Sequence, residues 1–240
     1  GSLTGLAVAN TTSDSITLNG ATGSFALQNC TVANSGVQGC TANCTTGILN
    51  WTVNQCTFTN NTFSDTVVNV TGTASQNVTL QNSVMNQSGS ALLFLNGNGV
   101  IGLTATNNTV NGGGVSLSGF GIQTTGTAQL SGLVSANNVT TCAQEGVLLG
   151  CDGNSNVRLR FNQNRLLGNG GGFFVGSTMN GNLGLAVTNN TSDTFSFTQV
   201  NPSICLVEGL ANLLTTLGNI GTVATFGTVQ DVPVGSLGIP

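Results

Sequence analysis

The chain has 240 residues, a net charge of −4 and only 4% charged residues. It has no His and no Lys, and its three Arg lie between positions 158 and 165, so no basic stripe can follow a phosphate backbone and nucleic-acid binding is excluded. No stretch approaches the roughly 18 uninterrupted apolar residues that a transmembrane helix needs, so no membrane-spanning segment is expected.

Residues 1–2 resemble the remnant of a cleaved tag, and residues 3–200 carry one repeated pattern. In this pattern alternating apolar residues run into an Asn, and small polar residues with a Gly-containing turn follow. The markers lie at positions 10, 29, 55, 82, 107, 137, 162 and 189, in steps of 19, 26, 27, 25, 30, 25 and 27 residues. A period of this size indicates a solenoid, in which each repeat buries its apolar face by stacking on its neighbours.

Within each repeat the apolar residues recur at a period of two, which is the periodicity of strands. Clusters of Gly, Asn and Ser divide each repeat into two or three such runs. The sequence therefore predicts an all-β fold, a right-handed parallel β-helix of about eight rungs. The recurring Asn residues should form one column at a corner, where stacked amides bond along the rod: Asn29, Asn82, Asn107, Asn162 and Asn189.

The C-terminal region departs from this pattern. Five Leu residues follow helical spacing: Leu206, Leu210, Leu213, Leu214 and Leu217. Asn201 as N-cap, Pro202 at the first helical position and Gly218 after the last turn frame this stripe. We expect a helical cap or insertion over 201–218, with one more irregular rung as the alternative, and a final strand with a tail over 219–240.

Seven Cys residues indicate an oxidising location. Two of them occupy the same place in successive repeats and are read either as a disulfide or as small buried apolar residues: Cys30 and Cys56. Two further pairs could each close a loop: Cys40 with Cys44, and Cys142 with Cys151. Cys205 is left as a free thiol that could cross-link to another molecule. Because His and a Cys-x-x-Cys motif are absent, we expect no metal and no cofactor.

One cluster of charges is a candidate ligand site: Glu145, Asp152, Arg158, Arg160 and Arg165. Arg158 and Arg160 alternate with apolar residues, so both should point outward and could grip a carboxylate or sulfate of a glycan. The alternative is a solvated ion-pair patch. Other Asp residues, including Asp65, fall in different columns and are interpreted as turn formers. We therefore expect no enzymatic activity, with a polysaccharide lyase or hydrolase kept as an alternative.

Two short motifs recur in the repeat region. Phe-x-x-Asn occurs at 58–61 and 161–164, and degenerate forms of Gly-Gly-Ala-(Ile/Leu/Val) occur at 89–92, 113–115 and 171–173. In these motifs the chain resembles the β-helical passenger domains of bacterial autotransporters, in particular those of the chlamydial polymorphic outer membrane proteins. The resemblance implies a surface-exposed adhesin passenger that a membrane β-barrel normally follows.

The sequence thus predicts a cell-surface or extracellular adhesin. Its partner would be a host-cell glycan or protein, bound through an uncharged face of Asn, Thr and Ser. The alternative is a structural subunit of a fibre or cell-envelope layer, because low charge, open rung ends and the spare Cys205 also predict end-to-end self-association.

Overall fold

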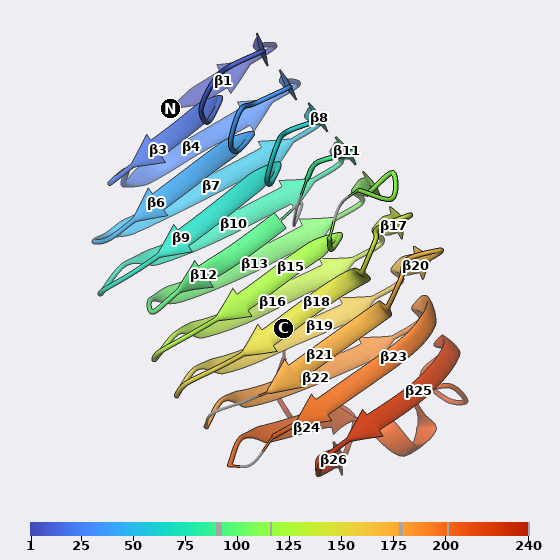
Figure 1. Cartoon of the computed structure of the whole chain (residues 1–240). Coiled ribbons are helices and arrows are strands. Elements are labelled where there is room, and N and C mark those ends of the chain that lie inside the picture. The colour runs from blue at the N-terminus through green and yellow to red at the C-terminus, as the bar shows by residue number, and fades with distance from the viewer. Residues whose placement is uncertain (90–92, 116, 178–179, 201, 240) are drawn as a thin grey trace.

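The computed structural model describes residues 1–89, 93–115, 117–177, 180–200 and 202–239, with the backbone alone over 93–96. The chain forms a parallel β-helix of about eight turns, which confirms the predicted all-β solenoid (Figure 1). The helical element in the described part is one short 3-10 helix, η1 (Leu210–Asn212). None of the described helices has the length and apolarity needed to cross a membrane.

One side of the rod is a parallel sheet of ten strands among the described residues, called the long sheet below. Its strands lie in the order β1 (Ser2–Thr4), β4 (Gly23–Gln28), β7 (Ile48–Asn54), β10 (Ser75–Gln81), β13 (Val100–Thr106), β16 (Gln129–Ser135), β19 (Asn156–Asn162), β22 (Asn182–Thr188), β24 (Ile204–Glu208) and β26 (Val229–Val232).

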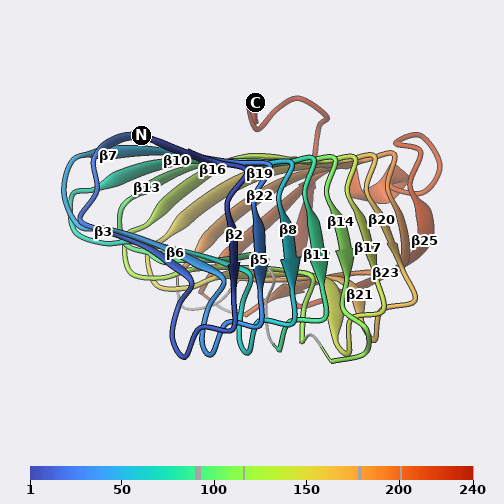
Figure 2. The same cartoon turned by 90° about the horizontal axis from the view of Figure 1, so that it is seen from above.

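The other two sides belong to a second sheet of sixteen described strands, because β23 (Thr191–Gln199) pairs with strands of both (Figure 2). The short side consists of β2 (Ala7–Ala9), β5 (Thr31–Ala33), β8 (Thr57–Thr59), β11 (Val84–Asn86), β14 (Thr109–Asn111), β17 (Asn138–Thr140) and β20 (Arg165–Leu167). The third side consists of β3 (Ile16–Asn19), β6 (Cys40–Cys44), β9 (Thr66–Val70), β12 (Leu93–Gly97), β15 (Phe120–Thr124), β18 (Glu145–Cys151), β21 (Gly172–Ser177) and β25 (Ile220–Phe226).

Successive turns stack in register, so the inward-facing residues of the period-two pattern pack into one core. Trp51, Val78 and Leu103 are register partners on β7, β10 and β13, and all three are buried. Their neighbours in sequence point outward, since successive side chains of a strand face opposite ways. Aromatic side chains pack in the same interior, with the Phe161 and Phe173 rings edge to face and their centroids 4.9 Å apart. The apolar residues of all turns therefore share one continuous core.

The corner after each long-sheet strand contains a residue with left-handed backbone, which explains the recurring amide in the sequence. This column contains Gly5, Asn29, Gln55, Asn82, Asn107, Ala136, Gln163, Asn189 and Gly218, each with φ between 52° and 66°. Asn and Gly tolerate this conformation best. The predicted column is thus correct at Asn29, Asn82, Asn107 and Asn189. It is wrong at Asn162, which is the last residue of β19.

The residue after this left-handed position forms a buried ladder of amides in the second half of the rod. Its members are Asn108, Asn137, Asn164, Asn190 and Asn219, all at most 3% exposed. The Nδ2 of each of the first four donates to the Oδ1 of the next Asn at 2.8 to 3.0 Å. Each Nδ2 also donates to a main-chain carbonyl of an earlier strand, as Asn164 does to Val134 at 2.9 Å. Hydrogen bonds between stacked amides along the rod were predicted for the left-handed position. The continuous ladder is formed by the residue that follows it.

The two repeated motifs occupy structural positions. In both copies of Phe-x-x-Asn, the Phe is buried on a strand and the Asn is a buried corner residue: Phe58 with Asn61, and Phe161 with Asn164. The glycines at 113 and 114 have positive φ in the turn after β14, and Gly172 has positive φ at the start of β21. The copy at 89–92 extends into residues 90–92, which lie outside the described residues.

The expected helical cap over 201–218 is not what the structure has. Residues 204–208 form β24, which pairs with β22 and places Cys205 beside Leu183, so this segment continues the long sheet. The free edge of β22 presents main-chain N–H and C=O groups that a further strand can pair with. This pairing stabilises residues 204–208 more than a helix that follows the Leu spacing would. Gly209, with φ 62°, ends the strand, and a short turn containing η1 then brings buried Leu213 against the core. Asn201, the expected N-cap, lies outside the described residues.

Candidate functional site

The five charged residues that the sequence groups together do not form one site. Arg158 and Arg160 lie on β19 in the long sheet, whereas Glu145 begins β18 in the second sheet. Asp152 follows β18, and Arg165 begins β20 on the short side, where its Nη1 donates to Asn138 at 3.1 Å. The fold therefore distributes these charges over three sides of the rod.

Arg158 and Arg160 bind the chain's own C-terminal segment. Arg158 Nη1 donates to the carbonyl of Leu237 at 2.6 Å, and Arg160 Nη2 donates to the carbonyl of Ile239 at 2.9 Å. The prediction that both guanidinium groups leave the outer face of one strand is confirmed by these contacts. Their partners within the chain are neutral main-chain carbonyls.

All seven Cys residues are free, buried thiols, so the structure contains none of the predicted disulfides. Cys40 and Cys44 lie at opposite ends of β6, about 13 Å apart in an extended strand, which is too far for a bond. Cys30 and Cys56 are stacked as predicted, but each thiol donates to a main-chain carbonyl, at 3.3 Å to Gln28 and Asn54 respectively.

The remaining Cys residues are equally enclosed. Cys142 lies at the corner after β17 and Cys151 ends β18, and burial raises the pKa of both thiols, that of Cys142 to about 12. Cys205 has no exposed surface, and burial raises its pKa to about 12 as well. A thiol in this state is neither accessible nor ionised, so the expected cross-link through Cys205 has no surface group to start from.

Asp65 lies in the bend before β9, in agreement with its interpretation as a turn former, but it faces the interior. It is fully buried, and its Oδ1 accepts hydrogen bonds from Asn61 Nδ2 at 2.6 Å and from Ser88 Oγ. Its Oδ2 is buried without a hydrogen-bond partner. Burial raises the pKa of Asp65 to about 7, against an ordinary value of 3.8.

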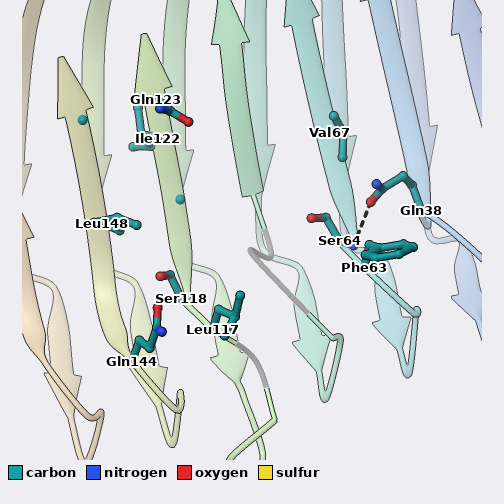
Figure 3. Close-up of a pocket in the computed structure, with 12 residues that line it drawn as sticks. Gln38, Phe63, Ser64, Val67, Leu117, Ser118, Ile122, Gln123, Gln144 and Leu148 are labelled. Atoms are coloured by element: carbon teal, nitrogen blue, oxygen red, sulfur yellow. Dashed lines mark hydrogen bonds between the residues drawn. The ribbon is translucent and has the colours of Figure 1, made fainter. Parts of the chain in front are cut away.

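A groove with a volume of about 540 Å³ lies on the third side (Figure 3). Strands β9, β15 and β18 and the loops that precede them contribute its wall residues, which are spread over several turns of the solenoid. The residues that line it are Gln38, Phe63, Ser64, Val67, Leu117, Ser118, Gly121, Ile122, Gln123, Gln144, Leu148 and Gly150.

Much of the groove's surface is apolar and open to solvent. Phe63 and Leu117 belong to loops of different turns, and their side chains are 50% and 47% exposed. Val67 lies on β9, after the loop that carries Phe63, and Leu148 lies on β18, on the far side of Leu117 from Phe63 (Figure 3). Exposed apolar side chains gathered in one concave surface are typical of a binding site.

The polar groups of the groove are amides and hydroxyls, and none of the described lining residues is charged. Gln38 is fixed because its Oε1 accepts a hydrogen bond from the Ser64 main-chain N–H at 2.7 Å. Gln123 and Gln144 are exposed. Ser118 donates to Glu145 Oε2 at 3.2 Å, so Glu145, one of the predicted site residues, lies just behind the groove wall.

Sequence reasoning did not identify this groove. The available signal was an apolar residue inside a polar loop, as in Thr62-Phe63-Ser64 and Ser116-Leu117-Ser118. Two such loops 54 residues apart cannot be assigned to one site until the register of the rungs is known. No protein-family model, curated protein or solved structure matches this chain.

Proposed function

We propose that this protein is a surface-exposed or secreted binding module of the adhesin type, which holds a neutral glycan in the groove on the third side. The observation that carries the proposal is the combination of an open apolar surface with amides and hydroxyls and no charge among the described lining residues. The groove volume, about 540 Å³, falls within the range of roughly 300 to 1,000 Å³ that is usual for ligand sites.

The chemistry of the lining favours a sugar over an ion. Phe63 offers an exposed aromatic face on which the C–H side of a pyranose ring can stack. The amides of Gln123 and Gln144 can both donate to and accept from sugar hydroxyls. A charged ligand would find no counter-charge among the described lining residues, so it would lose its hydration without compensation.

The cellular setting is part of the same proposal. A chain with repeated Phe-x-x-Asn motifs resembles autotransporter passengers, which act at the cell surface. A solenoid suits this role because each turn repeats the same binding chemistry along the rod. We therefore place the protein outside the cell, with host-cell glycans as its partners.

Filling the groove tests this function. In Gly150→Ile the new Cβ would meet only Gln123 Cγ at 3.7 Å, so the side chain can occupy the groove without disturbing the core. Gly176→Ile is the matched control, because Gly176 is the register partner of Gly150 on β21 and does not line the groove. Its added Cβ would likewise make an ordinary contact, at 3.6 Å to Phe174.

Wild type and both variants should be compared on an array of uncharged host-type glycans. We expect wild type and Gly176→Ile to bind the same glycans, and Gly150→Ile to bind them at least tenfold more weakly. Absence of neutral-glycan binding by wild type, or equal weakening in both variants, would reject the groove as the binding site.

A further inference from the structure

The C-terminal residues 233–239, called the strap below, fold back over the outer face of the long sheet (Figure 2). Leu237 and Ile239 pack there against Ala186 in a small apolar cluster that is separate from the main core. Arg158 and Arg160 hold the strap by its carbonyls, and Glu208 Oε1 accepts a hydrogen bond from the Leu237 N–H at 2.9 Å. The strap thus contacts two of the three cationic side chains of the protein, of which Arg160 is partly buried and Arg158 stays exposed.

These two Arg residues lack the partners that cations normally have. They lie two residues apart on β19, so their Cα atoms are about 6.6 Å apart on one face of the sheet. Each guanidinium donates to a strap carbonyl, and no ion pair with another described residue accompanies either contact. Arg160 Nε is buried without any hydrogen-bond partner. Two like charges placed side by side, with a donor unused, form a site that an anion would complete.

The strap is attached in a way that permits release. It is joined to β26 through a turn at 233–236, and the Ser236 N–H donates to the Pro233 carbonyl at 3.0 Å. Its described contacts with the sheet are three hydrogen bonds and the side chains of Leu237 and Ile239, which are buried at 8% and 6% exposure. Neutral carbonyls are weaker acceptors for a guanidinium than a carboxylate or sulfate.

We propose that the strap closes a latent anion site formed by Arg158 and Arg160, and that the ligand of this site is an acidic polysaccharide. A guanidinium fork matches the paired oxygens of a carboxylate or sulfate. Among the neighbouring outward positions on β16 and β19, Ser131 and Asn162 carry a hydroxyl and an amide that suit the hydroxyls of a sugar chain, and Leu133 beside Arg160 is apolar. The strap carbonyls occupy the places that the anionic groups take when the site is open.

This site differs in position and chemistry from the groove. It lies on the long sheet, whereas the groove lies on the third side and has no charged lining residue among those described. Binding to a neutral glycan and binding to an acidic one can therefore fail independently of each other.

The experiment compares the full-length chain with a strap-release variant, Leu237→Ser combined with Ile239→Ser. Binding is measured with dextran sulfate, with polygalacturonate as the carboxylate arm and with uncharged dextran as control. We expect the release variant to bind at least one of the two acidic polymers at least tenfold more tightly than wild type. Adding Arg158→Gln and Arg160→Gln should abolish this gain, whereas Arg165→Gln, on the short side, should leave it unchanged.

Two results would overturn the proposal: equal binding by wild type and the release variant, or a gain that persists without Arg158 and Arg160. If the release variant fails to fold, hydrogen exchange of the strap amides in wild type replaces it. The Leu237 amide should then exchange at least fivefold faster with saturating dextran sulfate than with dextran. Unchanged exchange with every polymer would also reject the strap as a closure.

Discussion

Replacing Asn164 with Ala should destabilise the protein more than truncating any other side-chain amide of β19 or of the corner that follows it. The Asn164 side chain makes four hydrogen bonds inside the rod. Its Nδ2 donates to Val134 O at 2.9 Å and to Asn190 Oδ1 at 2.8 Å, and its Oδ1 accepts from the N–H and the Nδ2 of Asn137 at 3.1 and 2.9 Å. Truncation removes the side-chain partner of the Asn137 N–H and of the Val134 carbonyl, whereas Asn190 Oδ1 keeps the Asn164 N–H and Asn137 Nδ2 keeps the Ala105 carbonyl. At about 1 to 3 kcal/mol for each unsatisfied group, two such groups give a loss of about 4 kcal/mol.

Asn162→Ala is the matched control. Asn162 lies two residues earlier and faces outward, and its Oδ1 accepts from Thr188 at 3.0 Å and from Asn189 at 3.3 Å, in bonds that water can replace. Its loss should change the free energy of unfolding by no more than about 0.5 kcal/mol. A loss of about 4 kcal/mol in a chain of this length lowers Tm by about 10 °C, which circular dichroism resolves easily.

Asn164→Asp provides a second test of the ladder. The added oxygen would face the Val134 carbonyl and Asn190 Oδ1, both acceptors, so the ionised side chain should be strongly destabilising. Protonation restores a donor, so this variant should regain part of its stability as the pH falls. If Asn164→Ala and Asn162→Ala shift Tm equally, the ladder does not stabilise the fold as argued.

Three further predictions concern the interior and the corners. Because burial raises the pKa of Asp65 from 3.8 to about 7, the stability this group contributes is complete below pH about 4 and is lost as the pH rises through about 7; the loss is on the order of 4 kcal/mol by pH 8. Asp65→Asn should remove this pH dependence in urea titrations, and an unchanged slope would contradict a buried, protonated Asp65. Ala136→Asn should stabilise the protein by about 1 kcal/mol, since Ala136 has φ 54°, whereas Ala33→Asn, at a strand position, should give no gain. All seven thiols should be inert to a maleimide in the native protein and all should react after unfolding without reductant; fewer reactive thiols would reveal a disulfide.

The fold could be predicted because a period of two and a step of about 26 residues leave few architectures open. The corner was harder, because adjacent amides such as Asn107-Asn108 and Asn189-Asn190 look alike in sequence. One member of each pair takes the left-handed backbone and the other enters the core, and composition cannot decide which. Where Ala136 or Gln163 takes the first place, the pattern shifts by one residue.

The candidate site was predicted less well than the fold. Arg158 and Arg160 were correctly placed on one outward face, but their partner is a segment nearly 80 residues later, at Leu237 and Ile239. The helical spacing of the C-terminal leucines was misleading, because an open sheet edge competes with helix formation and is a tertiary feature. The groove was missed for a similar reason, because Phe63 and Leu117 come to line one groove only when the turns of the solenoid stack.

The most direct test of the proposed function is a titration of the ¹⁵N-labelled protein with a neutral oligosaccharide selected from the array, observed at the side-chain amides of glutamine. The groove predicts concentration-dependent shifts at Gln123 and Gln144, and none at Gln129, an exposed glutamine of the long sheet. Shifts at Gln129 with unchanged Gln123 and Gln144 signals would show that the glycan binds elsewhere and would contradict the account.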